Sequence, residues 1–206
     1  KGKKVKSKKV KCLRGMVDEN KKKIGSYKTL RVYMKSECVY DVTHYFVRTF
    51  LDRQHDRTAD QMLQAARSGK QNIVEGYSDA EGSTESEHKL TVIAKGSLEE
   101  LKEDYQDYLR NNGLATWGPQ HYKYVASVPL CRKHNDSAWY RRQIQGRSAE
   151  DVANIARIAI HQTLAMLRGL IDHLDRKFLR EGGVKEQRYR ARIEYRNRQN
   201  NGGERQ

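Results

Sequence analysis

Apolar residues recur every three or four positions along most of this chain, which is the spacing of an amphipathic α-helix. The pattern predicts three helices within residues 26–113 and a fourth over residues 148–183. No segment shows the alternation of period two that is typical of a strand. We therefore expect an all-α fold, an antiparallel up-down four-helix bundle. The apolar face of the first helix is expected to comprise Leu30, Met34, Cys38, Val42, Tyr45 and Thr49.

Residues at the predicted helix ends support these boundaries. Asp56 or Thr58 can cap the second helix. Thr58 and Thr84 each stand three positions before Gln or Glu, as in a capping box, and Ser148 can cap the fourth helix. Gly113 and the pair Gly182-Gly183 would stop the third and fourth helices, because glycine readily adopts the left-handed conformation. The first three helices are therefore joined by short connections.

Small and polar residues interrupt the apolar faces of the second and third helices. A glycine inside a helix costs about 1 kcal/mol relative to alanine, so its presence indicates close approach of a neighbouring helix. Buried polar groups must be paired, so Asn72 and Glu75 predict hydrogen bonds between helices or subunits. We expect the following residues to serve helix packing: Gly69, Asn72, Glu75, Gly76 and Gly96.

Residues 114–147 interrupt the helical pattern. They contain both prolines and both tryptophans of the chain, with six Lys or Arg residues and one acidic residue. We expect an irregular insert between the third and fourth helices, with short helical turns, that packs on the bundle. Two interpretations of its composition stay open. Its aromatic rings stack on bases while its cations hold phosphates, or the rings bury against the bundle and the charges are solvated.

Positive charge is concentrated at the two ends of the chain. The formal net charge is +15, of which residues 1–25 carry +9 and residues 184–206 carry +4. We expect a disordered basic extension at the N-terminus and a basic tail at the C-terminus. Such segments bind polyanions through counterion release, or they act only as solvated tails. A start at Met16 would remove eight Lys and Arg residues of the extension.

Several classes of function find no support in the residues. Cys12, Cys38 and Cys131 lie far apart, which is typical of reduced thiols in a cytosolic protein. Cys131 and His134 are only two of the three or four ligands that zinc needs, so we expect no metal site. No nucleophile–base pair or cofactor loop can be assembled, so we expect no catalytic residue, no enzyme activity and no cofactor. No apolar run approaches the roughly 20 residues of a membrane span, and we expect a cytoplasmic protein without membrane contact.

Three stretches resemble a known family: 27–30 (YKTL), 67–77 (RSGKQNIVEGY) and 93–101 (IAKGSLEEL). Through them, residues 26–111 resemble small bacterial four-helix-bundle proteins with two branches. One branch is the protein encoded in intervening sequences of large-subunit ribosomal RNA genes, and the other is the accessory variability determinant of diversity-generating retroelements. The later region is similar to a suffix of longer members, although typical members have no insert like 114–147. The resemblance implies a homopentamer with a basic surface and, for the retroelement branch, binding to a reverse transcriptase and its template RNA.

Together these features predict a non-catalytic, oligomeric adaptor that binds nucleic acid, RNA rather than DNA, and assists a reverse transcriptase. The alternative is a protein–protein interaction scaffold without nucleic-acid contact. On a helix, Arg188, Arg192 and Arg196 would share one face, and arginine presents a planar fork suited to phosphate. The residues that we expect to contact nucleic acid are Lys21, Lys22, Lys23, Lys28, Arg31, Arg132, Lys133, Arg141, Arg142, Arg188, Arg190, Arg192, Arg196 and Arg198.

Overall fold

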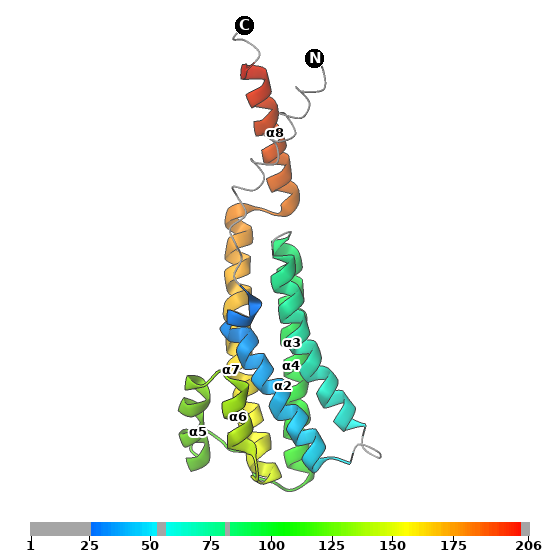
Figure 1. Ribbon diagram of the computed structural model, residues 1–206, viewed down its shortest axis with the longest axis vertical. Helices are drawn as coiled ribbons and strands as arrows, with labels where there is room; N and C mark the ends of the chain where they lie inside the picture. The colour runs from blue at the N-terminus through cyan, green and yellow to red at the C-terminus, as the bar shows by residue number, and fades with distance from the viewer. Residues whose placement is uncertain (1–25, 53–56, 81–82, 203–206) are drawn as a thin grey trace, which may run out of the picture.

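The computed structural model describes residues 26–52, 57–80 and 83–202, and every regular element in those ranges is a helix (Figure 1). The elements are η1 (Tyr27–Thr29), α2 (Arg31–Phe50), α3 (Thr58–Asp79), α4 (Thr84–Asn111), α5 (Tyr122–Lys133), α6 (Ser137–Ile144), α7 (Ala149–Glu181) and α8 (Val184–Gly202). The all-helical class that the apolar spacing predicts is therefore confirmed. The predicted N-terminal extension lies outside the described residues, and so do Lys21, Lys22 and Lys23.

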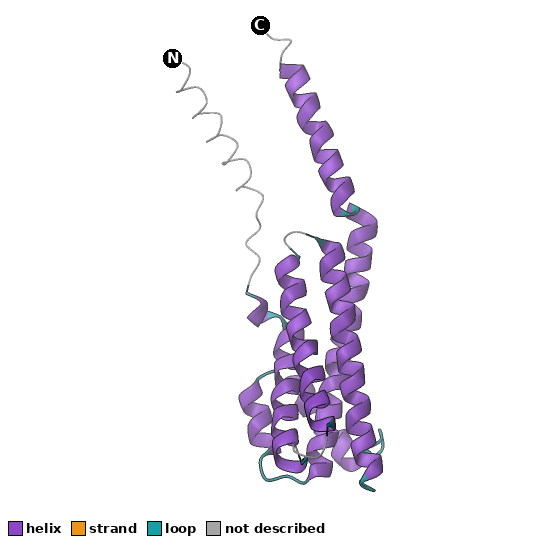
Figure 2. Cartoon of the chain, turned by 90° about the vertical axis from the view of Figure 1, so that its right-hand side faces the viewer, coloured by secondary structure: helices purple, strands orange, loops and turns teal. Residues whose placement is uncertain are grey.

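Four helices, α2, α3, α4 and α7, lie side by side along the long axis of the molecule and share an apolar core (Figures 1 and 2). α4 packs against α3 and α7, and α2 packs against the same two helices. Large side chains from all four helices are fully buried, among them Phe46, Met62, Leu101 and Leu164. Burying a side chain of this size contributes about 1.5–3 kcal/mol, so this core is the main source of stability.

The buried face of α2 is wider than the predicted one and rotated from it. Cys38 and Val42 are fully buried as expected, whereas Thr49 is exposed. Val39 and Phe46, which lie outside the predicted face, are fully buried. The reason is that α2 contacts three other helices, α3, α7 and α6. A single narrow stripe therefore does not describe its buried surface.

At the starts of α3 and α4, the residue at the N-cap position differs from the predicted one. α4 is capped by Ser83, one residue before the predicted Thr84, and the Ser83 hydroxyl accepts a hydrogen bond from the backbone N–H of Ser86 at 3.2 Å. α3 has Arg57 at its N-cap position, without a side-chain cap, in place of the predicted capping box at Thr58. Arg57 has helical backbone angles in place of the extended conformation of a capping residue. The alternative cap, Asp56, lies outside the described residues.

The predicted ends of the third and fourth helices agree with the structure. The Ser148 hydroxyl accepts from the backbone N–H of Asp151 at 3.2 Å and caps α7. Gly113 follows α4 with φ +64°, and Gly182 follows α7 with φ +76°. Both values lie in the left-handed region, where a side chain would be strained.

Two glycines of α3 allow α4 to approach closely. A Cβ atom at Gly69 would lie 2.7 Å from Leu98 Cδ2, and one at Gly76 would lie 3.3 Å from Leu90 Cβ. Gly96 differs, because a Cβ atom there would meet nothing within 4 Å. Gly96 therefore does not serve packing between the described helices of this chain, in contrast to the prediction.

The predicted polar network on α3 is mostly internal to that helix. The Asn72 amide donates to the backbone carbonyl of Ser68 at 2.9 Å, one turn earlier. Glu75 is exposed and accepts from the Gln71 side chain at 3.3 Å. The link between helices is the hydrogen bond between the hydroxyls of Ser68 and Ser97, at 2.9 Å. Within the chain, Glu75 therefore forms no part of a buried network, because it lies on the solvent side of α3.

The insert contains two helices, which corrects the prediction of an irregular segment. α5 packs on α7 and α6 packs on α2. Pro129 lies inside α5, on its exposed side. α5 buries only Cys131, and α6 buries only Tyr140 and Ile144. So few buried positions leave no recognisable apolar stripe in the sequence, which is why the helical pattern was hidden.

The basic C-terminal tail forms a continuous helix up to Gly202. α8 extends beyond the bundle along the long axis, after a break at Gly182 (Figures 1 and 2). Every side chain from Lys185 to Gln199 is exposed. Its arginines are therefore presented to solvent along its length.

Candidate nucleic-acid interface

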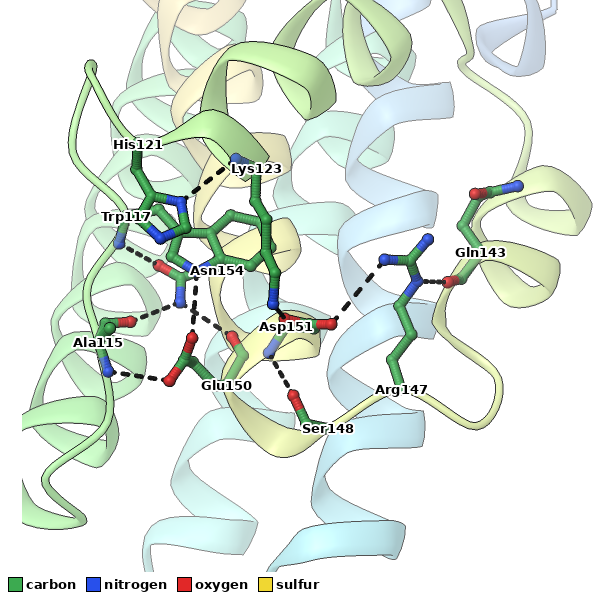
Figure 3. Close-up of polar contacts among 10 residues, drawn as sticks. All are labelled: Ala115, Trp117, His121, Lys123, Gln143, Arg147, Ser148, Glu150, Asp151 and Asn154. Atoms are coloured by element: carbon green, nitrogen blue, oxygen red, sulfur yellow. Dashed lines mark hydrogen bonds and ion pairs between the residues drawn. The ribbon is translucent and has the colours of Figure 1, made fainter.

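The insert is fastened to the start of α7 by a buried amide and a carboxylate (Figure 3). Asn154, almost completely buried, accepts a hydrogen bond from the backbone N–H of Trp117 at 2.9 Å and donates to the carbonyl of Ala115 at 2.8 Å. The Glu150 carboxylate accepts from the backbone N–H of Ala115 at 3.1 Å and from the indole N–H of Trp117 at 3.3 Å. The path of the chain from α4 into the insert is therefore set by two side chains of α7.

Asp151 forms a second anchor beside the first (Figure 3). Its carboxylate accepts from the Lys123 ammonium at 2.6 Å and lies 3.9 Å from the Arg147 guanidinium. The hydrogen bond to Asp151 raises the pKa of Lys123. The Lys123 ammonium also lies 5.4 Å from the centre of the Trp117 ring. Because its charge is compensated by Asp151, we assign Lys123 to holding the insert in place.

At its other end the insert is held by a buried lysine of α2. Lys35 is 1% exposed, and its ammonium donates to the backbone carbonyls of Cys131 and His134 and, at 3.1 Å, to the Tyr140 hydroxyl. The last carbonyls of a helix carry partial negative charge and lack partners within the helix, so a cation is favourable there. Burial lowers the pKa of Lys35. Lys35 thus joins α2 to both helices of the insert.

Most aromatic side chains of the insert serve its attachment. Trp117 and Tyr140 are buried, and the Trp139 ring stacks on His134 with 4.4 Å between ring centres. Tyr122 is the exception, with 73% of its surface exposed. Of the two interpretations left open by the sequence, burial of the rings describes Trp117 and Tyr140, and their faces are not free to stack on bases.

The basic residues predicted in the first helix and the insert are all exposed. Arg141 is tied to the bundle, because its guanidinium lies 3.1 Å from the Asp41 carboxylate of α2. Arg31 and Arg132 come together and line one cavity of about 510 Å³ between α2, α5 and α7, here named the α2–α7 cavity. Residues 101 positions apart in the sequence are therefore joined into one positively charged surface.

A second cavity of about 390 Å³, here named the α4–α7 cavity, adjoins the first. Arg132, His161 and Gln162 line both cavities. The charged, imidazole and aromatic residues of its wall are Lys102, Trp117, Tyr124, Arg132, Arg157 and His161. No carboxylate lines either cavity. Both are therefore suited to anions.

Sequence reasoning missed three cations here: Lys35, Lys102 and Arg157. Lys35 gave no signal, because it lies one turn before Val39 in the part of the buried α2 face that the apolar pattern did not predict. Arg157 and Lys102 also gave none, because each would be an ordinary surface charge if the insert did not cover α7. Their grouping is a consequence of the tertiary structure alone.

The surface between α3 and α4 has the opposite charge. Asp60, Glu100 and Asp104 line a cavity there with Arg57 as its one basic residue. Asp104 also lines a neighbouring cavity with Asp107. Burial, and then the charges of Asp107 and Glu100, raise the pKa of Asp104. A polyanion is therefore repelled from this side of the bundle.

The α8 arginines form a separate group at the far end of the molecule from α5 and α6 (Figure 1). Acidic and basic residues are distributed unevenly around α8. Residues four apart lie roughly 40° apart around a helix, so Arg188, Arg192 and Arg196 share one face, here named the arginine face. Glu186, Arg190, Glu194 and Arg198 share the opposite face. Each acidic residue there is one turn from an arginine of opposite charge, whereas the arginine face carries no carboxylate.

Clusters of metal-ligating side chains and exposed thiols are both absent from the described residues. They contain no group of three His, Cys, Asp or Glu side chains that could hold a metal ion. Cys38 and Cys131 are buried, and burial raises the pKa of the Cys38 thiol to about 12, which keeps it protonated and poorly nucleophilic. A search of the described helices for one long and apolar enough to cross a membrane finds none.

The structure thus arranges its basic residues in two groups, one at the insert and one on α8. The α8 group lies within one segment of the sequence. The insert group depends instead on the folding of α2, α4, α5 and α7 together. Comparison with protein-family models, with curated proteins and with solved structures finds no match for this chain.

Proposed function

We propose that this chain is a non-catalytic, oligomeric adaptor that binds nucleic acid, RNA in preference to DNA, through the arginine face of α8. The observation that carries the proposal is a wholly exposed helix whose one face presents Arg188, Arg192 and Arg196 without a carboxylate. Arginine binds phosphate through two parallel hydrogen bonds, and successive arginines one turn apart follow a strand of phosphates.

The lack of apolar contacts along α8 also supports a partner. A helix that is polar all round and exposed from Lys185 to Gln199 has little to stabilise it, because helices of this length are marginal in water. Tyr189 and Tyr195 are 67% and 52% exposed and flank the arginine face. Aromatic rings beside cations are the usual means of binding single-stranded RNA, by stacking on bases while the cations hold the backbone.

The finer arrangement of the bundle belongs to the same proposal. We propose that α2, α3, α4 and α7 alternate in direction as an antiparallel up-down bundle, since short connections join α2 to α3 and α3 to α4. The resemblance of residues 26–111 to the retroelement accessory proteins supports a homopentamer that assists a reverse transcriptase in the cytoplasm. In such an assembly several copies of α8 would act on one RNA and raise its affinity by multivalency.

A matched pair of double variants tests the arginine face. R192Q/R196Q removes two charges from that face, and R190Q/R198Q removes two charges from the opposite face of the same helix. Binding of a single-stranded RNA is measured by fluorescence anisotropy over a range of salt concentrations. For R192Q/R196Q we expect weaker binding and a slope of log K against log salt reduced by about 1.4, because each lost contact to a single strand removes about 0.7.

R190Q/R198Q should change the slope by less than half of that amount, because its arginines are compensated by glutamates. Equal effects of the two variants would refute the assignment to the arginine face. The absence of any RNA binding by the full chain at low salt would refute the function itself.

A protein-interaction scaffold is the second candidate, and the outer side of α5 favours it. Tyr122, Val125 and Leu130 are 73%, 58% and 48% exposed there. Exposed apolar groups of this size are typical of protein contact sites. V125D/L130D should abolish capture of a protein partner and leave RNA binding intact; if RNA binding falls as well, the scaffold role is not separable from it.

A further inference from the structure

The α4–α7 cavity contains a guanidinium whose hydrogen bonding is incomplete. The terminal nitrogens of Arg157 donate to Asn154 Oδ1 at 3.3 Å and to Gln106 Oε1 at 3.5 Å. Both partners are neutral amides. Its Nε atom is buried and has no hydrogen-bond partner among the described residues. Burying a donor without a partner is unfavourable, so an acceptor that reaches Arg157 would be favoured.

The electrostatics of Arg157 point to an anionic acceptor. Burial lowers the pKa of Arg157, and the charge of Glu103 opposes this effect without forming an ion pair with it. Glu103 is paired with Lys102 instead, at 2.9 Å. Arg132 and His161 line the same cavity and are exposed. An anion that enters it therefore meets several positive or ionisable groups and no carboxylate in the wall.

A second buried atom without a described partner favours a ligand that also carries a hydrogen-bond donor. Gln162 lines the cavity, and its Nε2 atom donates to the backbone carbonyl of Val128 at 3.1 Å. Its Oε1 atom is buried and accepts from no described residue. A hydroxyl group of the ligand would satisfy it. An anion with a nearby hydroxyl is the chemistry of a sugar phosphate.

We propose that the α4–α7 cavity binds the phosphate of a ribonucleotide, with Arg157 and Arg132 on the phosphate and Gln162 on a ribose hydroxyl. Its volume of about 390 Å³ falls within the range of small-ligand sites. The site is at the end of the bundle opposite α8 (Figure 1). Ligand binding in the α4–α7 cavity is therefore expected to be independent of RNA binding by α8.

The site is built only when the insert is docked. Asn154 accepts from Arg157 and from the backbone N–H of Trp117 with the same oxygen atom (Figure 3 shows the second contact). Arg132 is contributed by the last turn of α5, and Tyr124 by its first turn. Ligand binding and insert docking are therefore coupled, and the ligand should stabilise the insert.

Isothermal titration calorimetry of the full chain with adenosine monophosphate tests the proposal, with adenosine and inorganic phosphate as separate probes. We expect the monophosphate to bind, phosphate to bind more weakly and adenosine not to bind at all. R157Q and R132Q should each weaken binding about tenfold or more, as expected for loss of a charge-assisted hydrogen bond. R67Q, on the exposed face of α3, should bind as the wild type does.

R132Q carries the test if R157Q does not fold, because Arg132 is exposed. Competition by a short single-stranded RNA would assign the site to an RNA phosphate, and failure to compete would assign it to a free nucleotide. Binding of adenosine as tight as that of the monophosphate would overturn the proposal. So would the absence of any heat signal from the monophosphate at concentrations up to about 1 mM, since a Kd above that value corresponds to less than about 4 kcal/mol of binding free energy.

Discussion

Replacing Lys35 with methionine tests whether one buried lysine holds the insert on the bundle. Methionine keeps an unbranched, apolar side chain of similar length, so the substitution removes the ammonium and little packing. Three hydrogen bonds from the ammonium are lost, to the carbonyls of Cys131 and His134 and to the Tyr140 hydroxyl. The Cys131 carbonyl keeps one other donor, the Tyr140 hydroxyl at 3.3 Å. The last turn of α5 also loses the positive charge beside its free carbonyls.

The magnitude follows from two opposing terms. A hydrogen bond to a charged group contributes about 1.5–3 kcal/mol net, so three bonds give a ceiling of about 5–9 kcal/mol. Removing the ammonium also removes its desolvation cost, which is several kcal/mol and is the cause of the lowered pKa of Lys35. The difference is a loss of about 2–4 kcal/mol in the free energy of docking of the insert.

The chain supplies a local probe for this loss, because its only two tryptophans, Trp117 and Trp139, both lie in the insert. Urea unfolding is followed by tryptophan fluorescence, which reports on the insert, and by circular dichroism at 222 nm, which reports on all helices. For K35M we expect the fluorescence transition to move to lower urea and to separate from the dichroism transition. K89M, at an exposed position of α4, is the control.

Coincident transitions for K35M, displaced from the wild type by less than about 0.5 kcal/mol, would refute the reasoning, because that is the usual effect of a neutral surface substitution. They would show that the insert is held by its apolar contacts and by the Asn154 anchor alone. Lys35 would then be a tolerated buried charge without a structural role.

Three further outcomes follow from the packing and the buried titratable groups. G69A should destabilise by about 1–3 kcal/mol in urea unfolding, because its Cβ would meet Leu98, whereas G96A should stabilise by up to about 1 kcal/mol; equal effects would contradict the packing of α3 on α4. Burial raises the pKa of the Cys38 thiol from 9.0 to about 12, so its contribution to the free energy of unfolding is complete below pH 9 and is lost as the pH rises toward 12, by up to about 4 kcal/mol. C38A should make the free energy of unfolding depend less on pH between 9 and 12, and an unchanged slope would contradict burial of the thiol. N154A should lower the free energy of unfolding by about 2–3 kcal/mol, because it removes a buried amide that satisfies two backbone groups of the insert. The fluorescence transition should move to lower urea than the dichroism transition, and a shift no larger than that of K89M would contradict the role of Asn154 as an anchor.

Local pattern was enough for the helices of the bundle and not for the insert. α4 and α7 are long, have apolar residues in register with the helical period, and end at glycines with positive φ, so their existence follows from local chemistry. α5 and α6 bury so few residues that no period could reveal them. The width of the α2 face was also beyond local pattern, because it is set by the number of neighbours that α2 contacts.

Only some residues of the candidate site could likewise be predicted from the sequence. The exposed arginines of α8 could be predicted, since their spacing depends only on the helix that carries them. The anion cavity could not, because Lys102, Arg132 and Arg157 come from three helices and become neighbours only when the insert docks. A charge that looks like ordinary surface in the sequence acquires a role when another segment covers it.

The two groups of cations differ in what their surroundings allow them to bind. On α8 the arginines are fully solvated, so each contact to a phosphate is weak and strongly dependent on salt, and affinity must come from many contacts along a polymer. In the α4–α7 cavity Arg157 is half-buried and its Nε atom has no described partner. A single phosphate should therefore bind Arg157 more strongly than it binds an exposed arginine of α8, and salt should screen that interaction less. One end of the molecule is thus suited to a long polyanion and the other to one small anion. If both bind as proposed, raising the salt concentration should release RNA from α8 well before it releases the nucleotide from the cavity.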